Sequence, residues 1–250
     1  MKTGITLPVF DVAVSDAVDA AVDAERLGLD GVFVFDHLAP PGLSGNSAAL
    51  ECFSLLGAVG VVTKKVEIGA LVAKAWLRPP AVTAQAFSTL NVISKGRVVA
   101  GLGISDKLSA REVAAYFLDF PPRAERVRAL ERSVDEIKAA GIKAIWIGGS
   151  SATLLHIAAK HGLCVNLWNV PPGRVLEVRR VLAKLSGQPE SSLSLQVSWG
   201  ADLSLVEKDN GILEKVARNG ASYLIVGVPR RDLLKRAAKK LDTARRILGQ

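Results

Sequence analysis

The feature that most constrains this chain is a repeat of a short apolar run followed by an amphipathic segment. The runs are rich in β-branched and aromatic residues, and they lie at residues 4–7, 32–35, 66–72, 98–102, 144–147, 163–168, 193–198 and 223–228. Nearly continuous apolar strands that alternate with helices are typical of a parallel sheet that is covered by helices. The pattern therefore predicts eight parallel strands.

The segments between these runs show helical periodicity. We expect helices at residues 16–27, 48–62, 83–93, 123–140, 153–161, 175–185, 205–219 and 231–248, with a short helix within residues 106–122. Eight strand–helix units in 250 residues match a (β/α)8 TIM barrel. We predict one such domain over residues 1–250, and a doubly wound open sheet is the alternative.

The charge balance is basic, with a formal net charge of +8 and an isoelectric point near 9.7. Much of the excess lies in residues 123–132 and 230–246. Neither segment shows the aromatic and basic pattern of a nucleic-acid-binding module. We expect no nucleic-acid partner, and we expect the charge to attract an anionic small molecule such as a phosphorylated cofactor.

Cysteine usage and hydropathy bear on the compartment. Cys52 and Cys164 lie far apart among apolar residues, which predicts two buried, reduced thiols. The sequence has no apolar run of about 18 residues, and no apolar leader core precedes Pro8. These features predict a cytoplasmic protein with no membrane partner.

Ionisable residues follow two of the predicted strands. The carboxyl ends of barrel strands meet at one face, where barrel enzymes carry their sites. Asp36 and His37 follow the second strand, and His37 is the only histidine at a predicted strand end. Gly103 and Asp106 follow the fourth strand. These residues are candidates for an active site, but Asp36 and His37 can also cap a strand end, and Asp106 can cap a helix.

The turn after the fifth strand is a candidate phosphate site. Gly148, Gly149, Ser150 and Ser151 connect that strand directly to a helix. Glycines permit close backbone approach, and the free N–H groups of a helix N-terminus attract anions. The alternative is a tight turn with a plain N-cap serine. The usual phosphate site of TIM barrels follows strands 7 and 8, so this position departs from that pattern.

Several other site classes lack their motifs. No Cys-x-x-Cys or paired-histidine spacing indicates a metal site, and no GxSxG turn indicates an α/β-hydrolase. His156 and His161 lie on one predicted helix, where we expect them to pack or to face solvent.

Seven stretches together resemble the bacterial-luciferase-like family of flavin and deazaflavin oxidoreductases. In chain order they read GITLP, AAVDAERLGLDGVFVFDHL, LECFSLLGAVGVVTKKVEIGALV, RPPAVTAQAFSTLNVISKGRVVAGLG, FPPRAERVRALERSVDEIK, AIWIGGSSATLLHIAAKHGLCVNLW and GASYLIVGVP. They cover most of the chain. The resemblance implies the barrel fold and places a cofactor ring over the barrel mouth.

The resemblance also implies a cofactor site. The loop from Gly148 through Gly149 and Ser150 to Ser151 would hold the cofactor phosphate, with Gly103 nearby. The peptide bond between Leu71 and Val72 lies where many relatives carry a non-prolyl cis bond that backs the ring.

The resemblance implies a deazaflavin chemistry. Asp36 and His37 resemble a strand-end pair of relatives that use coenzyme F420, and Asp106 lies where such relatives can carry an acid. The implied function is hydride transfer between F420 and a small organic substrate. His37 would move the accompanying proton, and Asp36 or Asp106 would orient it or act as a second acid.

Three alternatives remain. With FMN the scaffold would suit a monooxygenase, and shortened relatives include flavin-binding barrels without turnover. A phosphate-binding isomerase or aldolase lacks a convincing strand-end Lys or Glu pair. The segments GIKA before the fifth strand and LAPPGLSGNSA after the second are short, so we expect a small lid and an open site. Residues 48–62 and 83–93 are candidates for a homodimer contact, although barrel packing explains their apolar character equally well.

Overall fold

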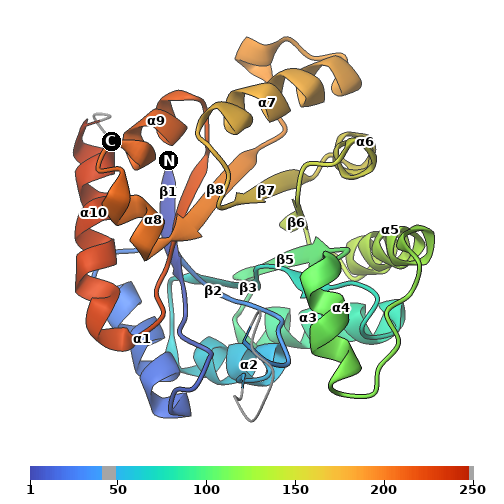
Figure 1. Ribbon diagram of the computed structural model, residues 1–250, viewed down its shortest axis with the longest axis horizontal. Coiled ribbons are helices and arrows are strands. Elements are labelled where there is room, and N and C mark those ends of the chain that lie inside the picture. Colours follow the sequence, from blue (N-terminus) through green and yellow to red (C-terminus); the bar gives the residue numbers. More distant parts are fainter. Residues whose placement is uncertain (41–48, 248–250) are drawn as a thin grey trace.

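A closed parallel barrel is the centre of the molecule (Figure 1). The computed structural model describes residues 1–40 and 49–247. Each strand is parallel to its neighbours, and the pairing of β3 with β5 closes the ring. The strands are β1 Lys2–Thr6, β2 Gly31–Val34, β3 Glu67–Ala70, β4 Ala73–Lys74, β5 Val98–Gly103, β6 Ile145–Gly148, β7 Cys164–Trp168, β8 Val197–Asp202 and β9 Tyr223–Gly227. This topology confirms the predicted TIM barrel and excludes the open sheet.

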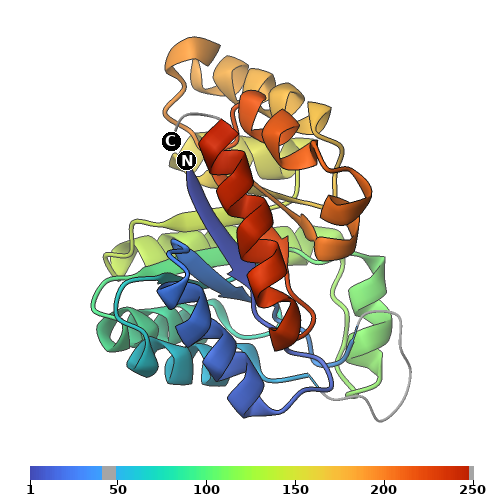
Figure 2. The same ribbon diagram turned by 90° about the vertical axis from the view of Figure 1, so that its left-hand side faces the viewer.

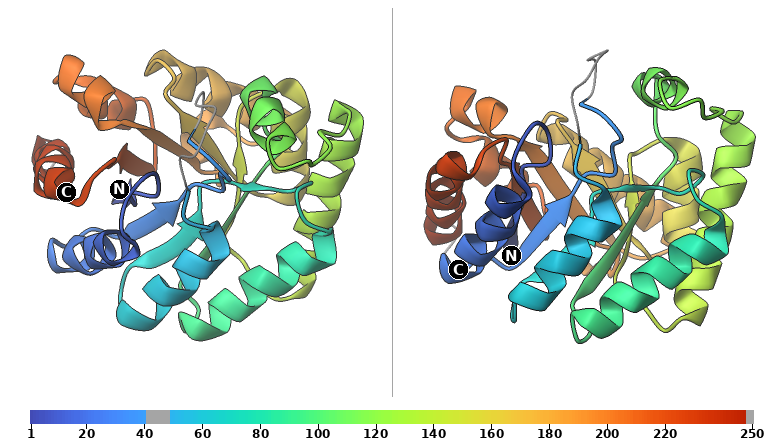
Figure 3. Two further views of the ribbon diagram at one scale, coloured as in Figure 1. Left: turned by 60° about the horizontal axis from the view of Figure 1, so that its bottom comes forward. Right: turned by 90° about the horizontal axis from the view of Figure 1, so that it is seen from below.

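Helices surround this barrel (Figure 3). They are α1 Val14–Arg26, α2 Cys52–Val62, α3 Pro80–Ile93, α4 Lys107–Ala114, α5 Arg123–Ala139, α6 Ala152–His161, α7 Gly173–Ser186, α8 Leu203–Lys208, α9 Ile212–Arg218 and α10 Leu234–Ile247, with 3-10 turns η1 Glu190–Ser192 and η2 Arg231–Leu233. The predicted short helix within residues 106–122 is confirmed as α4. The predicted helix over residues 48–62 begins at Cys52, and Ala48 lies outside the described residues.

The structure corrects three predicted elements. The seventh predicted strand begins at Val197 and not at residue 193, because the Gln188 side chain accepts hydrogen bonds from the backbone and hydroxyl of Ser194 and holds a turn there. The helix predicted over residues 205–219 is two helices. Asp209 accepts from the Gly211 N–H, which forms a turn between them.

The third correction concerns the strand predicted over residues 66–72. It is divided into β3 and β4. The Leu71–Val72 peptide bond between these strands is cis, as the family resemblance implies.

The inside of the barrel is filled by aromatic side chains. Phe33, Trp146 and Tyr223 are each at most 6% exposed, and their ring centroids lie 5.2–5.6 Å apart. A side chain at Gly31 would place its Cβ 2.3 Å from the Tyr223 hydroxyl. Glycine is therefore required there, because the packed interior has no room to relax.

The outer layer of the core lies between the strands and the helices. Residues adjacent to Phe33, such as Val32 and Val34, point to this layer and are fully buried, as the alternation of strand side chains requires. α10 lies beside α1 (Figure 2). Arg231, in η2 directly before α10, forms ion pairs with Asp19 and Asp23 of α1.

The two cysteines are buried and free, as predicted. Burial raises the pKa of the Cys164 thiol to about 12, even though hydrogen bonds with Ser198 lower it. Within residues 1–40 and 49–247, no helix is both long and apolar enough to cross a membrane.

Candidate functional site

Asp36 forms a buried ion pair at the end of β2. Asp36 is 3% exposed. Its carboxylate accepts two hydrogen bonds from Arg78, at 2.8 and 3.0 Å. The backbone N–H of Lys74, in β4, donates to the same carboxylate at 2.8 Å. Arg78 also pairs with Glu51 at 2.9 Å. A bidentate pair of this kind is geometrically specific, so Asp36 fixes the end of β2 against β4.

His37 pairs with a carboxylate that lies far away in the sequence. Its Nδ1 is 2.8 Å from Glu112 Oε2, in α4, and the Leu38 N–H donates to the other carboxylate oxygen. The His37 side chain is 26% exposed and that of Glu112 is 5% exposed. The pair is thus partly open to solvent on the imidazole side and closed on the carboxylate side.

Lys74 is the buried cation of this cluster. Its Nζ lies 3.2 Å from Glu112 Oε1 and 3.4 Å from His37 Nδ1, and it donates to the backbone oxygen of Asp36. The side chain is 5% exposed. A buried ammonium is stable only when it is paired and hydrogen-bonded, and the contacts with Glu112 and the Asp36 carbonyl meet that condition.

Glu112 is held in its ionised form. Burial raises the pKa of this carboxyl, but the hydrogen bonds from His37 and the Leu38 N–H and the charge of Lys74 outweigh it and bring the pKa to about 2. An ionised carboxylate only accepts hydrogen bonds. We therefore assign the proton to His37 Nδ1, which leaves Nε2 as a proton acceptor.

The predicted phosphate loop lies at the end of β6 and meets two arginines. Arg174 donates to the Ser150 hydroxyl at 3.1 and 3.2 Å and to the Ser150 carbonyl at 3.0 Å. Arg123 donates to the Ser151 hydroxyl at 3.1 Å. Gly149 has φ of 102°, a backbone conformation that glycine adopts without strain. The loop thus brings two positive charges to the start of α6.

The other predicted cofactor residues gather around the Val72 side chain. A Cβ at Gly103 or at Gly148 would lie 2.6 or 2.7 Å from a Val72 methyl group. Both glycines therefore leave room for Val72. The structure brings Leu71, Val72, Gly103 and Gly148 together at the ends of β3, β5 and β6, next to Lys74.

Asp106 lies apart from the contacts described for His37. Its Oδ1 accepts from the Ser109 N–H at 3.3 Å, which is the helix-capping alternative. Its catalytic role, like that of Asp36, stays a prediction. His156 is exposed on α6, and His161 is partly buried, in line with the packing or exposure predicted for them.

Sequence reasoning missed Glu112, Lys74, Arg123 and Arg174. Glu112 and Lys74 are separated from His37 by 75 and 37 positions. One signal was present for Lys74, which is a lone charge in the apolar stretch GALVAKAW. An isolated charge in a buried strand requires a partner, and the Asp36-His37 strand end offers one.

A cavity of about 350 Å³ lies at the carboxyl ends of β1, β8 and β9. We call it the mouth cavity. Phe10 and Phe35 belong to its wall, and their ring centroids lie 5.9 and 6.2 Å from that of His37. The cavity and the His37 cluster are therefore adjacent.

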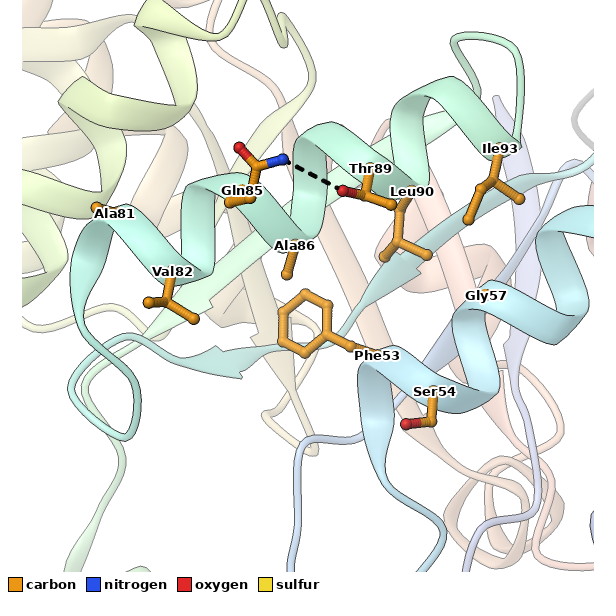
Figure 4. A pocket seen from close by; sticks show the side chains of 10 residues that line it. All are labelled: Phe53, Ser54, Gly57, Ala81, Val82, Gln85, Ala86, Thr89, Leu90 and Ile93. Atoms are coloured by element: carbon orange, nitrogen blue, oxygen red, sulfur yellow. Dashed lines mark hydrogen bonds between the residues drawn. The ribbon is translucent and has the colours of Figure 1, made fainter.

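A second hollow lies on the outside of the barrel, between α2 and α3 (Figure 4). Its volume is about 610 Å³, and Phe53, Ala86 and Ile93 line it. Residues 52–62 and 80–93 contain no charged residue. Val61, Val82 and Val92 on these helices are 61%, 53% and 77% exposed. This apolar surface, which we call the α2/α3 face, is outside the barrel mouth.

Comparison with known proteins gives a family match and several relatives. The family model described as Luciferase-like monooxygenase matches residues 1–141. The chain is 36% identical over 139 residues to an F420-dependent glucose-6-phosphate dehydrogenase of Amycolatopsis mediterranei, which covers 55% of this chain and 41% of that protein. A protein of the same name from Rhodococcus hoagii is 29% identical over 230 residues, which covers 88% of this chain and 65% of that protein. The chain thus spans less than two thirds of these relatives.

Solved structures share the fold over nearly the whole chain. An F420-dependent secondary alcohol dehydrogenase in complex with an F420-acetone adduct superposes with a TM-score of 0.79 and 16% identity, over 97% of this chain and 98% of that one. The coenzyme F420 dependent tetrahydromethanopterin reductase from Methanopyrus kandleri superposes with a TM-score of 0.71 and 16% identity, over 96% of each chain. At this identity the likeness concerns the fold alone, and it agrees with the predicted barrel.

Proposed function

Because this chain belongs to the luciferase-like monooxygenase family, we propose that it is an F420-dependent oxidoreductase that transfers a hydride between coenzyme F420 and a small organic substrate. The observation that carries this proposal is the His37–Glu112 pair at the barrel mouth. Relatives and structural neighbours named for F420 support the choice of cofactor.

The residues present fit an anionic cofactor. Arg123 and Arg174 bring two guanidinium groups to Ser150 and Ser151, and guanidinium groups are well suited to phosphate. These four residues would hold the cofactor phosphate together with the backbone of Gly149. Leu71, Val72, Gly103 and Gly148 would lie against the ring. When bound, F420 would accept or donate a hydride at C5 of its deazaflavin ring.

The chain's own residues would handle the proton. His37 Nε2 accepts the hydroxyl proton when an alcohol is oxidised and returns it in the reverse direction. Glu112 holds the Nδ1–H and stabilises the imidazolium that forms. Lys74 offsets the carboxylate charge, and Asp36 with Arg78 fixes the backbone that carries His37. Asp106 remains a candidate second acid.

Cofactor titration tests this proposal. We expect the protein to bind F420, measured by the cofactor's fluorescence, and to reduce it with an organic alcohol. Binding of FMN alone would replace the deazaflavin proposal with an FMN-dependent monooxygenase. Binding of F420 with no turnover on any substrate, together with a harmless His37→Ala, would favour a non-catalytic binding barrel.

A change at Gly149 tests the phosphate loop. Its φ of 102° and a Leu154 methyl group 3.2 Å from its Cβ position leave little room for a side chain. We expect Gly149→Val to weaken F420 binding by about tenfold or more, because the loop must approach the phosphate closely. Gly141→Val, at another glycine of positive φ with open space around its Cβ position, is the control. Unchanged F420 affinity in Gly149→Val would mean that the loop is only a turn.

We propose that a second copy of the chain covers the α2/α3 face. Each copy carries a net charge of +8, so two copies repel one another wherever charged faces meet. The α2/α3 face avoids this repulsion, since its helices are uncharged, and it exposes valines that gain from burial.

Solution mass measurement tests the homodimer. We expect a dimer for the wild-type protein and a monomer for Val82→Glu, because a carboxylate in an apolar interface is desolvated without a partner. Val181→Glu, at an exposed valine on α7, should remain dimeric. A monomeric wild-type protein at micromolar concentration contradicts the proposal.

A further inference from the structure

The mouth cavity has an almost wholly apolar lining. Val9, Leu203 and Val228 are each at most 4% exposed as residues and line the cavity together with Phe10 and Phe35. The phenyl rings stack with a centroid distance of 6.5 Å and an interplanar angle of 9°. Such a lining gains free energy only when it covers apolar ligand surface.

The cavity shares its aromatic wall with the proton-handling residue. His37 meets Phe10 and Phe35 edge-on, with interplanar angles of 61° and 69°. A molecule that presents its reacting carbon to His37 can therefore place the rest of its body between these rings and the ends of β1, β8 and β9. The cavity thus borders His37 through the Phe10 and Phe35 rings.

The charge in the cavity is negative. Among the lining residues that the structure describes, Asp202 is the one with an ionisable side chain. Its Oδ2 accepts from Asn169 at 2.6 Å, and its Oδ1 lies 3.1 Å from the Cβ position of Gly227, which also lines the cavity. Asp202 is exposed at this wall, and its carboxylate repels a phosphate or carboxylate on the ligand, an effect that salt weakens.

Three cations of the described residues near the barrel mouth pair with carboxylates. Lys74 pairs with Glu112, and Arg78 pairs with Asp36 and Glu51. Arg230, which directly follows the cavity wall at Pro229, pairs with Asp232 at 2.7 Å. An anionic substrate would compete with these carboxylates for the cations and would face Asp202.

We propose that the mouth cavity binds the body of an uncharged, apolar alcohol or ketone, and that it excludes sugar phosphates. This inference rests on the proposed function. In the oxidation direction the carbinol C–H bond breaks, and the hydride leaves with its electron pair for oxidised F420, which is thereby reduced. The hydroxyl proton passes to His37, and a carbonyl forms on the substrate.

Binding to the cofactor-free protein tests the ligand class without turnover. The probes are 1-phenylethanol and glucose 6-phosphate, followed by saturation-transfer NMR. We expect a signal from 1-phenylethanol, its loss in Ser204→Trp, and no displacement of 1-phenylethanol by glucose 6-phosphate. Ser204 is exposed at the cavity rim, so an indole there fills the cavity without entering the core. Ser191→Trp, at an exposed serine on η1, is the control and should bind like the wild type.

Kinetics with F420 complete the test. We expect Ser204→Trp to lower the ratio of kcat/KM for 1-phenylethanol to that for 2-propanol by about tenfold or more, mainly through KM. We expect Asp202→Asn to weaken the discrimination against glucose 6-phosphate. Displacement of 1-phenylethanol by glucose 6-phosphate, or an unchanged ratio in Ser204→Trp, overturns the inference.

Two outcomes separate this inference from the proposed function. A protein that does not bind F420 but binds 1-phenylethanol in the cavity contradicts the proposed function and removes the substrate role of the cavity. A protein that reduces F420 with glucose 6-phosphate and not with 1-phenylethanol supports the proposed function and contradicts the inference alone.

Discussion

The two sides of the barrel mouth differ in how they are built. On the side of β2 and β4, the charged side chains of Asp36, Lys74 and Glu112 are buried, and the partly buried Arg78 pairs with Asp36. On the side of β1, β8 and β9, mostly apolar side chains surround a cavity whose described lining contains one carboxylate, that of Asp202. A buried ionic network tolerates one geometry, whereas an apolar wall accepts ligands of different shape. We infer that the first side sets the chemistry and the second sets the substrate.

Removal of the His37 imidazole, on the charged side of the mouth, should have the largest effect on activity. We expect His37→Ala to lower kcat by about 10²–10⁴-fold, because the alcohol proton loses its acceptor, while the affinity for F420 is retained. Steady-state kinetics and fluorescence titration measure the two quantities. His156→Gln, at an exposed histidine on α6, is the control. A kcat within about twofold of wild type for His37→Ala, well below the loss expected of a general base, removes His37 from the mechanism.

Lys74→Met should destabilise the charged side. The change leaves Glu112 buried without its cation, which we expect to cost about 3 kcal/mol in the free energy of unfolding. Lys160→Met breaks an exposed pair with Glu131 and should cost less than about 1 kcal/mol. Urea unfolding measures both. Equal losses of unfolding free energy in the two variants would mean that the buried Lys74–Glu112 pair stabilises the protein no more than a surface ion pair does.

The Glu112 pKa gives a smaller effect with a defined pH range. The pKa of the Glu112 carboxyl in the folded protein, about 2, lies below its ordinary value of 4.5. The carboxylate therefore stabilises the folded state fully above pH 4.5, and this contribution is lost as the pH falls through about 2. The shift corresponds to about 3 kcal/mol of stability. We therefore expect Glu112→Gln to flatten the decline in unfolding free energy between pH 5 and pH 2. A decline as steep as in wild type contradicts the assignment.

The sequence predicts the fold well because the barrel is built from local periodicity. Eight apolar runs gave the strands, and their carboxyl ends placed His37 and the Gly149 loop at one face. The errors arose where a side chain decided the local structure, as Gln188 does before β8 and Asp209 does after α8. Neither effect changes hydrophobic periodicity.

The site was less predictable because its bonds join distant positions. His37 was identifiable from its strand end, but Glu112 has no local motif and reaches His37 only through the packing of α4. The arginines at the serine loop come from α5 and α7, and their periodicity is that of ordinary solvated helices. The apolar cavity likewise draws on β1, β8 and β9, which meet only when the barrel closes.

Single-turnover reduction of F420 tests the central claim most directly. Protein and oxidised F420 are mixed with 1-phenylethanol that carries hydrogen or deuterium at the carbinol carbon, and the loss of the oxidised deazaflavin absorbance is followed. We predict F420 reduction that is slower with deuterium and absent in His37→Ala under conditions where F420 remains bound. F420 reduction that is unaffected by His37→Ala, or no reduction despite bound F420 and bound alcohol, would contradict the account.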